Sequence, residues 1–171
     1  MAKDKNKNLE KTNAMRKLDE LKIEYGQHTY VDTGAVSGVE VAGVLGQDPG
    51  QCFKTLVTVG KTGQHYVYMV PVAAELDLKK AAKAVGEKSI EMIKSKELLP
   101  LTGYIHGGCS PIGMKKFFKT TIHETAAGYG TIFFSGGRIG FQIELSIDRL
   151  KEVIDFQIAD IIKEEQKDEN N

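Results

Sequence analysis

Two segments place polar or flexible residues among apolar ones and could do chemistry. Lys54 lies within the apolar run CFKTLVTVG, and the segment TGYIHGGCSPIG concentrates glycine and proline around Cys109. A lysine in a strand could bind a phosphate or orient an ester, or it could simply extend its charge into solvent. Glycines let backbone N–H groups approach an oxyanion, although the same composition also makes an ordinary tight connection. Both interpretations of each segment stay open at this point.

The cysteines and histidines lack the spacing of a metal site. Cys52 and Cys109 form no CxxC motif, and the four histidines show no i,i+4 pair. No histidine and acid are recognisably arranged to activate Cys109, so a packed thiol is favoured over a nucleophile. His106 either borders a pocket or is exposed in a loop. We predict free thiols and no metal.

Length and charge balance indicate one domain. The 171 residues are 41% hydrophobic, and no apolar run approaches the roughly 18 residues that span a bilayer. Lys+Arg and Asp+Glu each number 23, which argues against the unselective phosphate binding of a very basic protein. The first residues lack the apolar segment of a secretory signal. We predict a cytoplasmic domain at 11–162 between disordered tails at 1–10 and 163–171.

The N-terminal part is predicted to contain two helices and a strand. Apolar residues recur every three positions after Thr12, which favours an amphipathic helix ending near Gly26. Residues 28–31 indicate a short strand before a glycine-broken loop. The segment GVEVAGVLG then suggests a short helix that ends at Gly46.

The middle of the chain is predicted to form a hairpin followed by a helix. The runs CFKTLVTVG and HYVYMVPV are joined by the turn-like KTGQ, and this hairpin is expected at the centre of a sheet. Asp77 at a helix start and Gly86 just past its end follow the order that helix capping prefers.

The C-terminal part is predicted to add a strand, a second hairpin and a last helix. KTTIHE has the composition of a strand, and TIFFSGGRIGFQIEL that of a hairpin with the turn SGGRIG. A docked helix is expected from the cap Ser146 to about residue 162. Its apolar face would be Leu150, Val153, Ile154, Ile158 and Ile161. Runs of strands between helices favour an α+β fold with a mixed sheet or barrel-like core flanked by helices.

Several of these segments together resemble a known family. KTNAMRKLDELKIEY, CFKTLV, PVAAELDLKKAAKAVG, TGYIHGGCSPIG and SGGRIGFQIEL occur in the order and approximate spacing of the YbaK family, the prolyl-tRNA synthetase-associated editing domain. The resemblance covers about residues 11–162. It implies a mixed, barrel-like fold and removal of an amino acid from tRNA, chiefly cysteine from the tRNA for proline. It implies neither a metal nor a nucleotide cofactor.

The resemblance also implies partners and chemistry. The partner is the aminoacyl-tRNA acceptor end, with prolyl-tRNA synthetase as a possible source of substrate, because cysteine and proline are too similar in size for one pocket to separate strongly. The thiol of the bound cysteine would attack its own ester carbonyl and leave as a thiolactone. The protein would then supply shape and dipoles more than a base.

Site residues follow from the resemblance position by position. Lys54 falls on the family's essential lysine, with a role in binding and electrostatics, since nothing in the sequence indicates the depressed pKa of a lysine base. The implied catalytic group is Lys54, Gly107 and Gly108. The implied substrate-binding group is Tyr30, Thr55, Cys109, Ser110, Pro111, Ser135 and Gln142.

Some of these assignments have competing interpretations. Tyr30 could wall the pocket or only pack in its strand, and Ser135 could lie at the rim or be a turn residue. Gln142 departs from the aspartate that many members carry, and an amide cannot neutralise an ammonium. Activity toward alanine or serine esters, and a non-catalytic module that binds tRNA or a synthetase, therefore remain alternatives.

Overall fold

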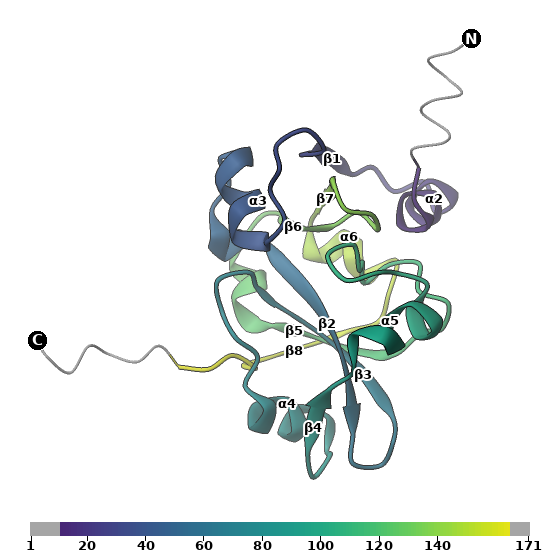
Figure 1. Ribbon diagram of the computed structural model, residues 1–171, viewed down its shortest axis with the longest axis vertical. Coiled ribbons are helices and arrows are strands. Elements are labelled where there is room, and N and C mark those ends of the chain that lie inside the picture. Colours follow the sequence, from purple (N-terminus) through teal and green to yellow (C-terminus); the bar gives the residue numbers. More distant parts are fainter. Residues whose placement is uncertain (1–10, 165–171) are drawn as a thin grey trace, which may run out of the picture.

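Two β-sheets, surrounded by short helices, make up the computed structural model, which describes residues 11–164 (Figure 1). The larger sheet has five strands in the order β4-β2-β3-β5-β8, and the smaller has three in the order β1-β7-β6. An isolated parallel bridge between Cys52 and Phe133 joins them. The α+β class is confirmed: the larger sheet is mixed, the smaller is antiparallel, and the barrel-like core does not close into one barrel.

The N-terminal elements follow the predicted order. Helix α2 (Asn13–Glu20) is capped by the Thr12 hydroxyl, which accepts from the Met15 N–H at 3.1 Å. It ends earlier than the predicted limit near Gly26, and strand β1 (Gly26–Thr29) begins there instead. Helix α3 (Gly38–Leu45) ends at Gly46 as predicted, and the short 3-10 helix η1 (Pro49–Gln51) leads into the larger sheet.

The predicted hairpin is the centre of the larger sheet. Strands β2 (Phe53–Gly60) and β3 (His65–Pro71) pair antiparallel, with β4 (Ile90–Met92) beside β2 and β5 (Lys119–His123) beside β3. Helix α4 (Leu78–Val85) lies between the Asp77 cap and Gly86, as predicted.

Two helices cover opposite faces of this hairpin. Tyr66 and Tyr68 of β3 pack with Ala81 and Ala82 of α4, whereas Val67 packs with Leu98. Leu98 belongs to α5 (Ser95–Thr102), a helix that the sequence analysis did not predict, and Pro100 inside it argues against a helix on local grounds. Burial of Leu98 and Thr102 supplies the tertiary support.

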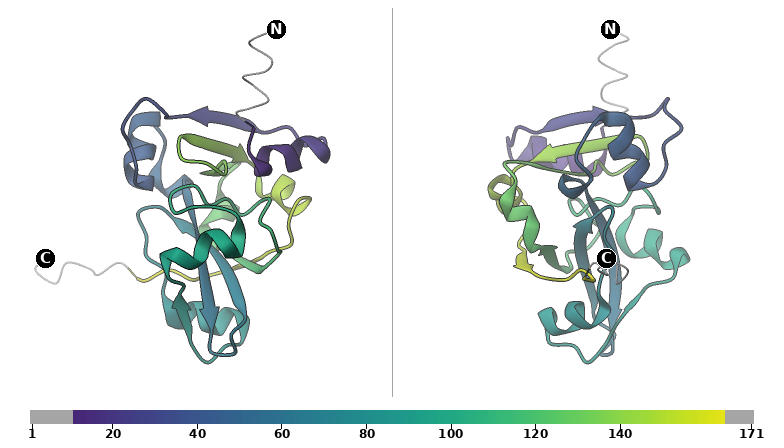
Figure 2. Two further views of the ribbon diagram at one scale, coloured as in Figure 1. Left: turned by 45° about the vertical axis from the view of Figure 1, so that its right-hand side comes forward. Right: turned by 90° about the vertical axis from the view of Figure 1, so that its left-hand side faces the viewer.

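The second predicted hairpin is confirmed in the smaller sheet. Strands β6 (Ile132–Ser135) and β7 (Phe141–Leu145) pair antiparallel, β1 adds to the other edge of β7, and the 3-10 helix η2 (Glu124–Gly128) precedes them. Both views in Figure 2 place this sheet across one end of the β2–β3 hairpin. The largest core cluster joins the two sheets and α2 through Met15, Phe53, Met69 and Ile143.

The long C-terminal helix was predicted wrongly. Ser146 caps a helix as expected, but α6 covers only Ile147–Lys151, and the chain then runs extended as β8 (Gln157–Ala159), parallel to β5. Ile158 is 40% exposed, so it does not lie on a buried helical face. The backbone N–H and C=O groups of this extended segment form hydrogen bonds with β5 and with the segment before α4. These hydrogen bonds decide its structure, although its apolar residues have helical spacing.

The predicted tails lie outside the described residues except for Lys163 and Glu164. Lys163 forms an ion pair with Glu75 at 3.1 Å. Among residues 11–164, no helix is both long and apolar enough to cross a bilayer.

Candidate active site

A pocket of about 350 Å³ lies where the two sheets meet. The start of β2, the N-terminal end of α3, the β6–β7 hairpin and the glycine-rich loop after α5 all contribute to its wall. Its polar lining is Tyr30, Ser37, Lys54, Thr55, His106, Ser135 and Gln142. The volume falls within the range of roughly 300–1,000 Å³ that is usual for small-molecule sites.

Lys54 is half-buried at the border between this pocket and an open groove. It lines both, and the groove is also lined by Glu75, Lys79 and Lys163. Burial lowers the pKa of Lys54, and the carboxylate of Glu75 acts in the opposite direction. No side-chain hydrogen bond or ion pair within residues 11–164 holds its ammonium group. A ligand that enters the pocket can therefore become its partner.

Thr55 follows Lys54 on β2 and also lines the pocket. Its Oγ1 is the one fully buried side-chain oxygen or nitrogen within residues 11–164 that lacks a hydrogen-bond partner. A buried hydroxyl left unpaired costs about 1–3 kcal/mol, so a ligand that pairs with it gains that interaction.

The glycine-rich loop divides into a part that faces the pocket and a part that holds the loop. Gly107 lines the pocket and has a φ of 85°, which favours glycine. Gly108 donates its N–H to Ile105 at 2.9 Å, and a Cβ there would lie 3.1 Å from the backbone nitrogen of Ile139. Gly108 therefore allows the loop to pack against the β6–β7 turn.

The rest of the loop is buried structure. Ser110 is fully buried, and its Oγ accepts from the N–H of Ile112 at 3.3 Å. Pro111 is also buried, and neither residue lines the pocket. Cys109 does line it, although only 7% of the residue is exposed.

Tyr30 and Ser135 both line the pocket, and Tyr30 lies just after β1 and not within it. Tyr30 lines the pocket and packs with Val41 in a small cluster. Ser135 lines the pocket while its Oγ accepts from the Gly137 N–H at 3.1 Å, so it is also a turn residue. Its hydroxyl hydrogen remains able to donate.

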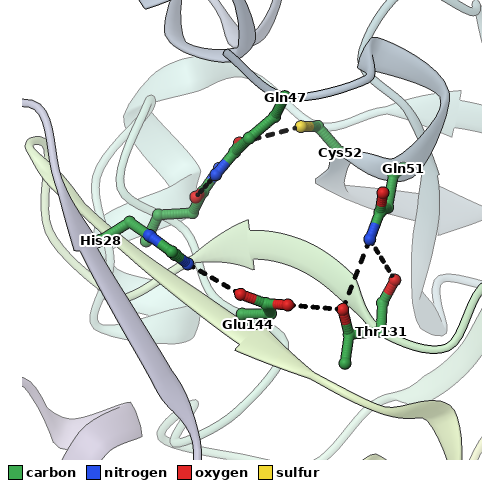
Figure 3. A network of polar contacts seen from close by, with 7 residues as sticks. His28, Gln47, Gln51, Cys52, Thr131 and Glu144 are labelled. Atoms are coloured by element: carbon green, nitrogen blue, oxygen red, sulfur yellow. Dashed lines mark hydrogen bonds and ion pairs between the residues drawn. The ribbon is translucent and has the colours of Figure 1, made fainter. Parts of the chain in front are cut away.

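Gln142 is 5% exposed and forms a reciprocal amide pair with Gln47. Gln47 donates to Gln142 Oε1 at 2.7 Å, and Gln142 donates to Gln47 Oε1 at 2.9 Å. The Cys52 thiol also donates to Gln47 Oε1, at 3.2 Å (Figure 3). Sequence reasoning did not find Gln47, because it lies in the turn after α3, about a hundred residues from its partner.

A second polar network lies two residues further along β7. Glu144 Oε1 lies 2.8 Å from His28 Nε2, and its other oxygen accepts from Thr131 Oγ1 at 2.6 Å (Figure 3). Gln51 donates to the Thr131 carbonyl oxygen at 2.8 Å. The hydrogen bond from Thr131, and then that from His28, lowers the pKa of Glu144.

Both thiols at the pocket are held in the protonated form. Burial raises the pKa of Cys52 to about 11, helped by Asp48, and burial raises that of Cys109 to about 12. Neither has the thiolate character of a nucleophile. Within residues 11–164, no three side chains of His, Cys, Asp or Glu gather as metal ligands.

The N-terminal end of α3 lines the pocket through residues 36–39, which sequence reasoning did not assign to the site. Ser37 and Glu40 form a capping box there, with hydrogen bonds of 3.2 Å and 3.0 Å. The spacing S-x-x-E was visible in the sequence and could have located this helix start.

Comparisons with known proteins show the family and the fold of this chain. A family model described as an aminoacyl-tRNA editing domain matches residues 32–153. EbsC of Enterococcus faecalis, named as a Cys-tRNA(Pro)/Cys-tRNA(Cys) deacylase, is 44% identical over 162 residues, which cover 94% of this chain and 99% of EbsC.

Two solved structures are also similar. A protein described as a trans-editing enzyme for prolyl-tRNA synthetase has a TM-score of 0.80 and 25% identity, with 89% of this chain and 96% of that chain covered. The hypothetical protein APE2540 has a TM-score of 0.81 at 19% identity, with 89% and 100% covered, which is a likeness of fold. The family match, the EbsC identity and the fold together confirm the predicted relationship: this chain belongs to the aminoacyl-tRNA editing domain family.

Proposed function

We propose that this protein deacylates tRNA carrying the wrong amino acid, with Cys-tRNA(Pro) as the main substrate and Cys-tRNA(Cys) as a second one. The observation that carries the proposal is the pocket, which gathers Lys54, Thr55 and Gly107 from separate elements. The relative EbsC is named for both substrates. Editing supplies discrimination that a synthetase pocket cannot reach between amino acids of similar size.

The three residues have distinct proposed roles. Lys54, at the border of the pocket and the groove, holds a phosphate of the acceptor end and orients the ester. Thr55 Oγ1, which has no partner among residues 11–164, donates to the bound aminoacyl group. The backbone of Gly107 stabilises the oxyanion that forms on the ester carbonyl.

The nucleophile is proposed to come from the substrate. Cys52 and Cys109 are buried and protonated, so the protein offers no reactive thiol in the pocket. The thiol sulfur of the bound cysteine attacks its own ester carbonyl, and the carbon–oxygen bond to the terminal ribose breaks. The thiol proton ends on the ribose oxygen, which releases a thiolactone and a free acceptor end.

The other implicated residues assist binding or hold the loop in this scheme. Tyr30 and Ser135 wall the aminoacyl group, whereas Ser110 and Pro111 hold the loop that carries Gly107. Prolyl-tRNA synthetase is the proposed source of mischarged tRNA, and the chain's zero formal net charge fits delivery by a partner. We place the activity in the cytoplasm, where aminoacyl-tRNA is made and used.

A side-by-side deacylation assay tests this proposal. Purified protein is incubated with Cys-tRNA(Pro), Ala-tRNA(Pro), Ser-tRNA(Pro) and Cys-tRNA(Cys), and loss of each ester is compared with a no-protein control. We expect rapid loss of cysteine from both tRNAs. Preferential loss of alanine or serine would assign another substrate. No loss from any ester, with prolyl-tRNA synthetase added, would leave a non-catalytic binding module.

A further inference from the structure

The pocket around Lys54 contains no acidic side chain among the described residues that line it. The titratable groups that do line it are Tyr30, Cys52, Lys54, His106 and Cys109. Glu75 acts on Lys54 from the adjoining groove, and Asp48 acts on Cys52 from the segment before β2. The α-ammonium of a bound aminoacyl ester would find one fixed cation here and no anion.

The polar group that Gln142 offers is neutral and fixed in orientation. Both its oxygen and its nitrogen are bonded to Gln47, at 2.7 Å and 2.9 Å. An amide has two N–H donors and two oxygen lone pairs, so Gln142 keeps one of each. The Cys52 thiol donates a hydrogen bond to Gln47 Oε1 at 3.2 Å. This bond favours the orientation in which the Gln47 oxygen, and not its nitrogen, faces Cys52, and so it also fixes the orientation of Gln142.

This arrangement has a consequence for the charge of the substrate. A cation that leaves water for a pocket without an anion loses hydration free energy, and an uncharged amine loses much less. Ordinary α-amino groups have pKa values of about 7.7–8.0, so an uncharged fraction is present near neutral pH. The N–H that Gln142 retains can donate to the lone pair of an uncharged amine, which an ammonium does not have, whereas its neutral oxygen supplies no negative charge to offset the lost hydration of an ammonium.

We propose that the Gln47–Gln142 pair makes this pocket select aminoacyl esters whose α-nitrogen is uncharged or absent, and that Gln47 is the positioning residue that holds Gln142 for this purpose. The inference rests on the proposed deacylase function and specifies its substrate class.

A substrate comparison on the wild-type protein is the first test. Cysteinyl-tRNA(Pro) and 3-mercaptopropionyl-tRNA(Pro), which lacks the amino group but keeps the thiol, are compared from pH 6 to pH 8.5. Each kcat/KM is divided by the uncatalysed ester-loss rate at the same pH. We expect the 3-mercaptopropionyl ester to be used, and the ratio of cysteinyl to 3-mercaptopropionyl kcat/KM to rise as the α-amino group loses its proton.

Gln142→Glu is the matched charge variant, because it keeps the side-chain length and adds an anion. We expect it to favour the cysteinyl ester roughly ten- to hundredfold at pH 6, the range of a hydrogen bond to a charged group. The ratio should then fall as pH rises. Gln64→Glu adds the same charge in the exposed β2–β3 turn and should leave the wild-type ratio unchanged.

Gln47→Met tests positioning without touching Gln142. Freed from Gln47, the Gln142 oxygen can turn and offer both of its lone pairs to an ammonium, so the pH dependence of the ratio should flatten. A purely structural role for Gln47 would lower kcat/KM for both esters equally and leave that pH dependence intact, which would overturn the positioning claim. Thermal unfolding of each variant verifies that the compared proteins are folded.

Failure of this inference can be told apart from failure of the proposed function. Loss of cysteine from Cys-tRNA(Pro) with rejection of the 3-mercaptopropionyl ester at every pH would overturn the neutral-nitrogen inference while leaving the deacylase. A ratio of cysteinyl to 3-mercaptopropionyl kcat/KM that falls as pH rises in the wild-type protein would also overturn the neutral-nitrogen inference. Absence of cysteine loss would instead contradict the function itself.

Discussion

Gln142 and Glu144 lie two residues apart on the same face of β7, but one is a neutral residue at the pocket and the other is a charged residue bonded within the protein. Glu144 is a carboxylate whose oxygens are bonded within the protein by His28 and Thr131. Gln142 lines the pocket and is paired with another neutral amide. The protein thus places its negative charge where its own groups satisfy it and leaves the pocket wall neutral. The residue that departs from the family's aspartate is therefore part of a built arrangement with Gln47.

The largest expected effect is the loss of activity when Lys54 in the pocket is replaced. Lys54→Met keeps most of the side-chain length and removes the charge, so kcat/KM for Cys-tRNA(Pro) should fall about 10²- to 10³-fold, as when one preorganised electrostatic contact to a transition state is lost. Single-turnover deacylation measures this. Lys79→Met, in the adjoining groove only, is the matched control. Equal effects of the two substitutions would contradict a specific role for Lys54.

The amide pair should matter for stability as well. Gln142→Leu leaves Gln47 without its partner and should lower the free energy of unfolding by about 1–3 kcal/mol. Adding Gln47→Leu should recover part of that loss, because both polar partners are then gone. Urea denaturation of the wild-type protein, the two single variants and the double variant gives the four free energies of unfolding of this double-mutant cycle. Purely additive losses would show that the two amides do not interact.

The contribution of Glu144 to the free energy of unfolding should depend on pH. Its folded pKa is lowered below the unfolded value, so its contribution to stability is present above the unfolded pKa and is lost as pH falls through the folded pKa. Glu144→Gln should reduce the free energy of unfolding by about 0.5–1.5 kcal/mol at pH 7. That difference should shrink below about pH 4.3, where glutamate ordinarily titrates. A constant difference at every pH would contradict this explanation.

The smallest expected effect on activity is that of Cys109. Its thiol is buried and protonated, so Cys109→Ala should leave the rate of Cys-tRNA(Pro) deacylation within assay error while costing about 1 kcal/mol of stability, an ordinary value for a core substitution. A loss of activity comparable with that of Lys54→Met, in a folded protein, would instead make Cys109 a participant in the chemistry.

Local signals predicted much of the fold. The β2–β3 and β6–β7 hairpins, the α4 caps and the helix stop at Gly46 follow from nearby residues. The C-terminal segment failed because pairing with β5 decides it, and its partner lies some 36 residues earlier. Helix α5 was missed because its support is the burial of Leu98, which no local pattern reveals.

The candidate site was predictable only at the positions that match the motifs of the family. Lys54, Thr55, Gly107 and Ser135 line the pocket, whereas Gly108, Ser110 and Pro111 do not, and the roles of all seven stay predictions. The Gln47–Gln142 pair and the Glu144 network were out of reach, because each joins side chains that lie far apart in the sequence. At position 142, the sequence indicates that a negative charge is missing, but it does not indicate that Gln142 pairs with Gln47.

In the proposed mechanism, the protein positions the ester and the thiol of the substrate itself is the nucleophile. The most direct test compares single-turnover deacylation of cysteinyl-tRNA(Pro) with that of S-methylcysteinyl-tRNA(Pro), which fills the pocket similarly but has no free thiol. We predict rapid loss of cysteine and no loss of S-methylcysteine beyond the uncatalysed rate. Equal rates for the two esters would contradict the claim and require a nucleophile from water or from the protein.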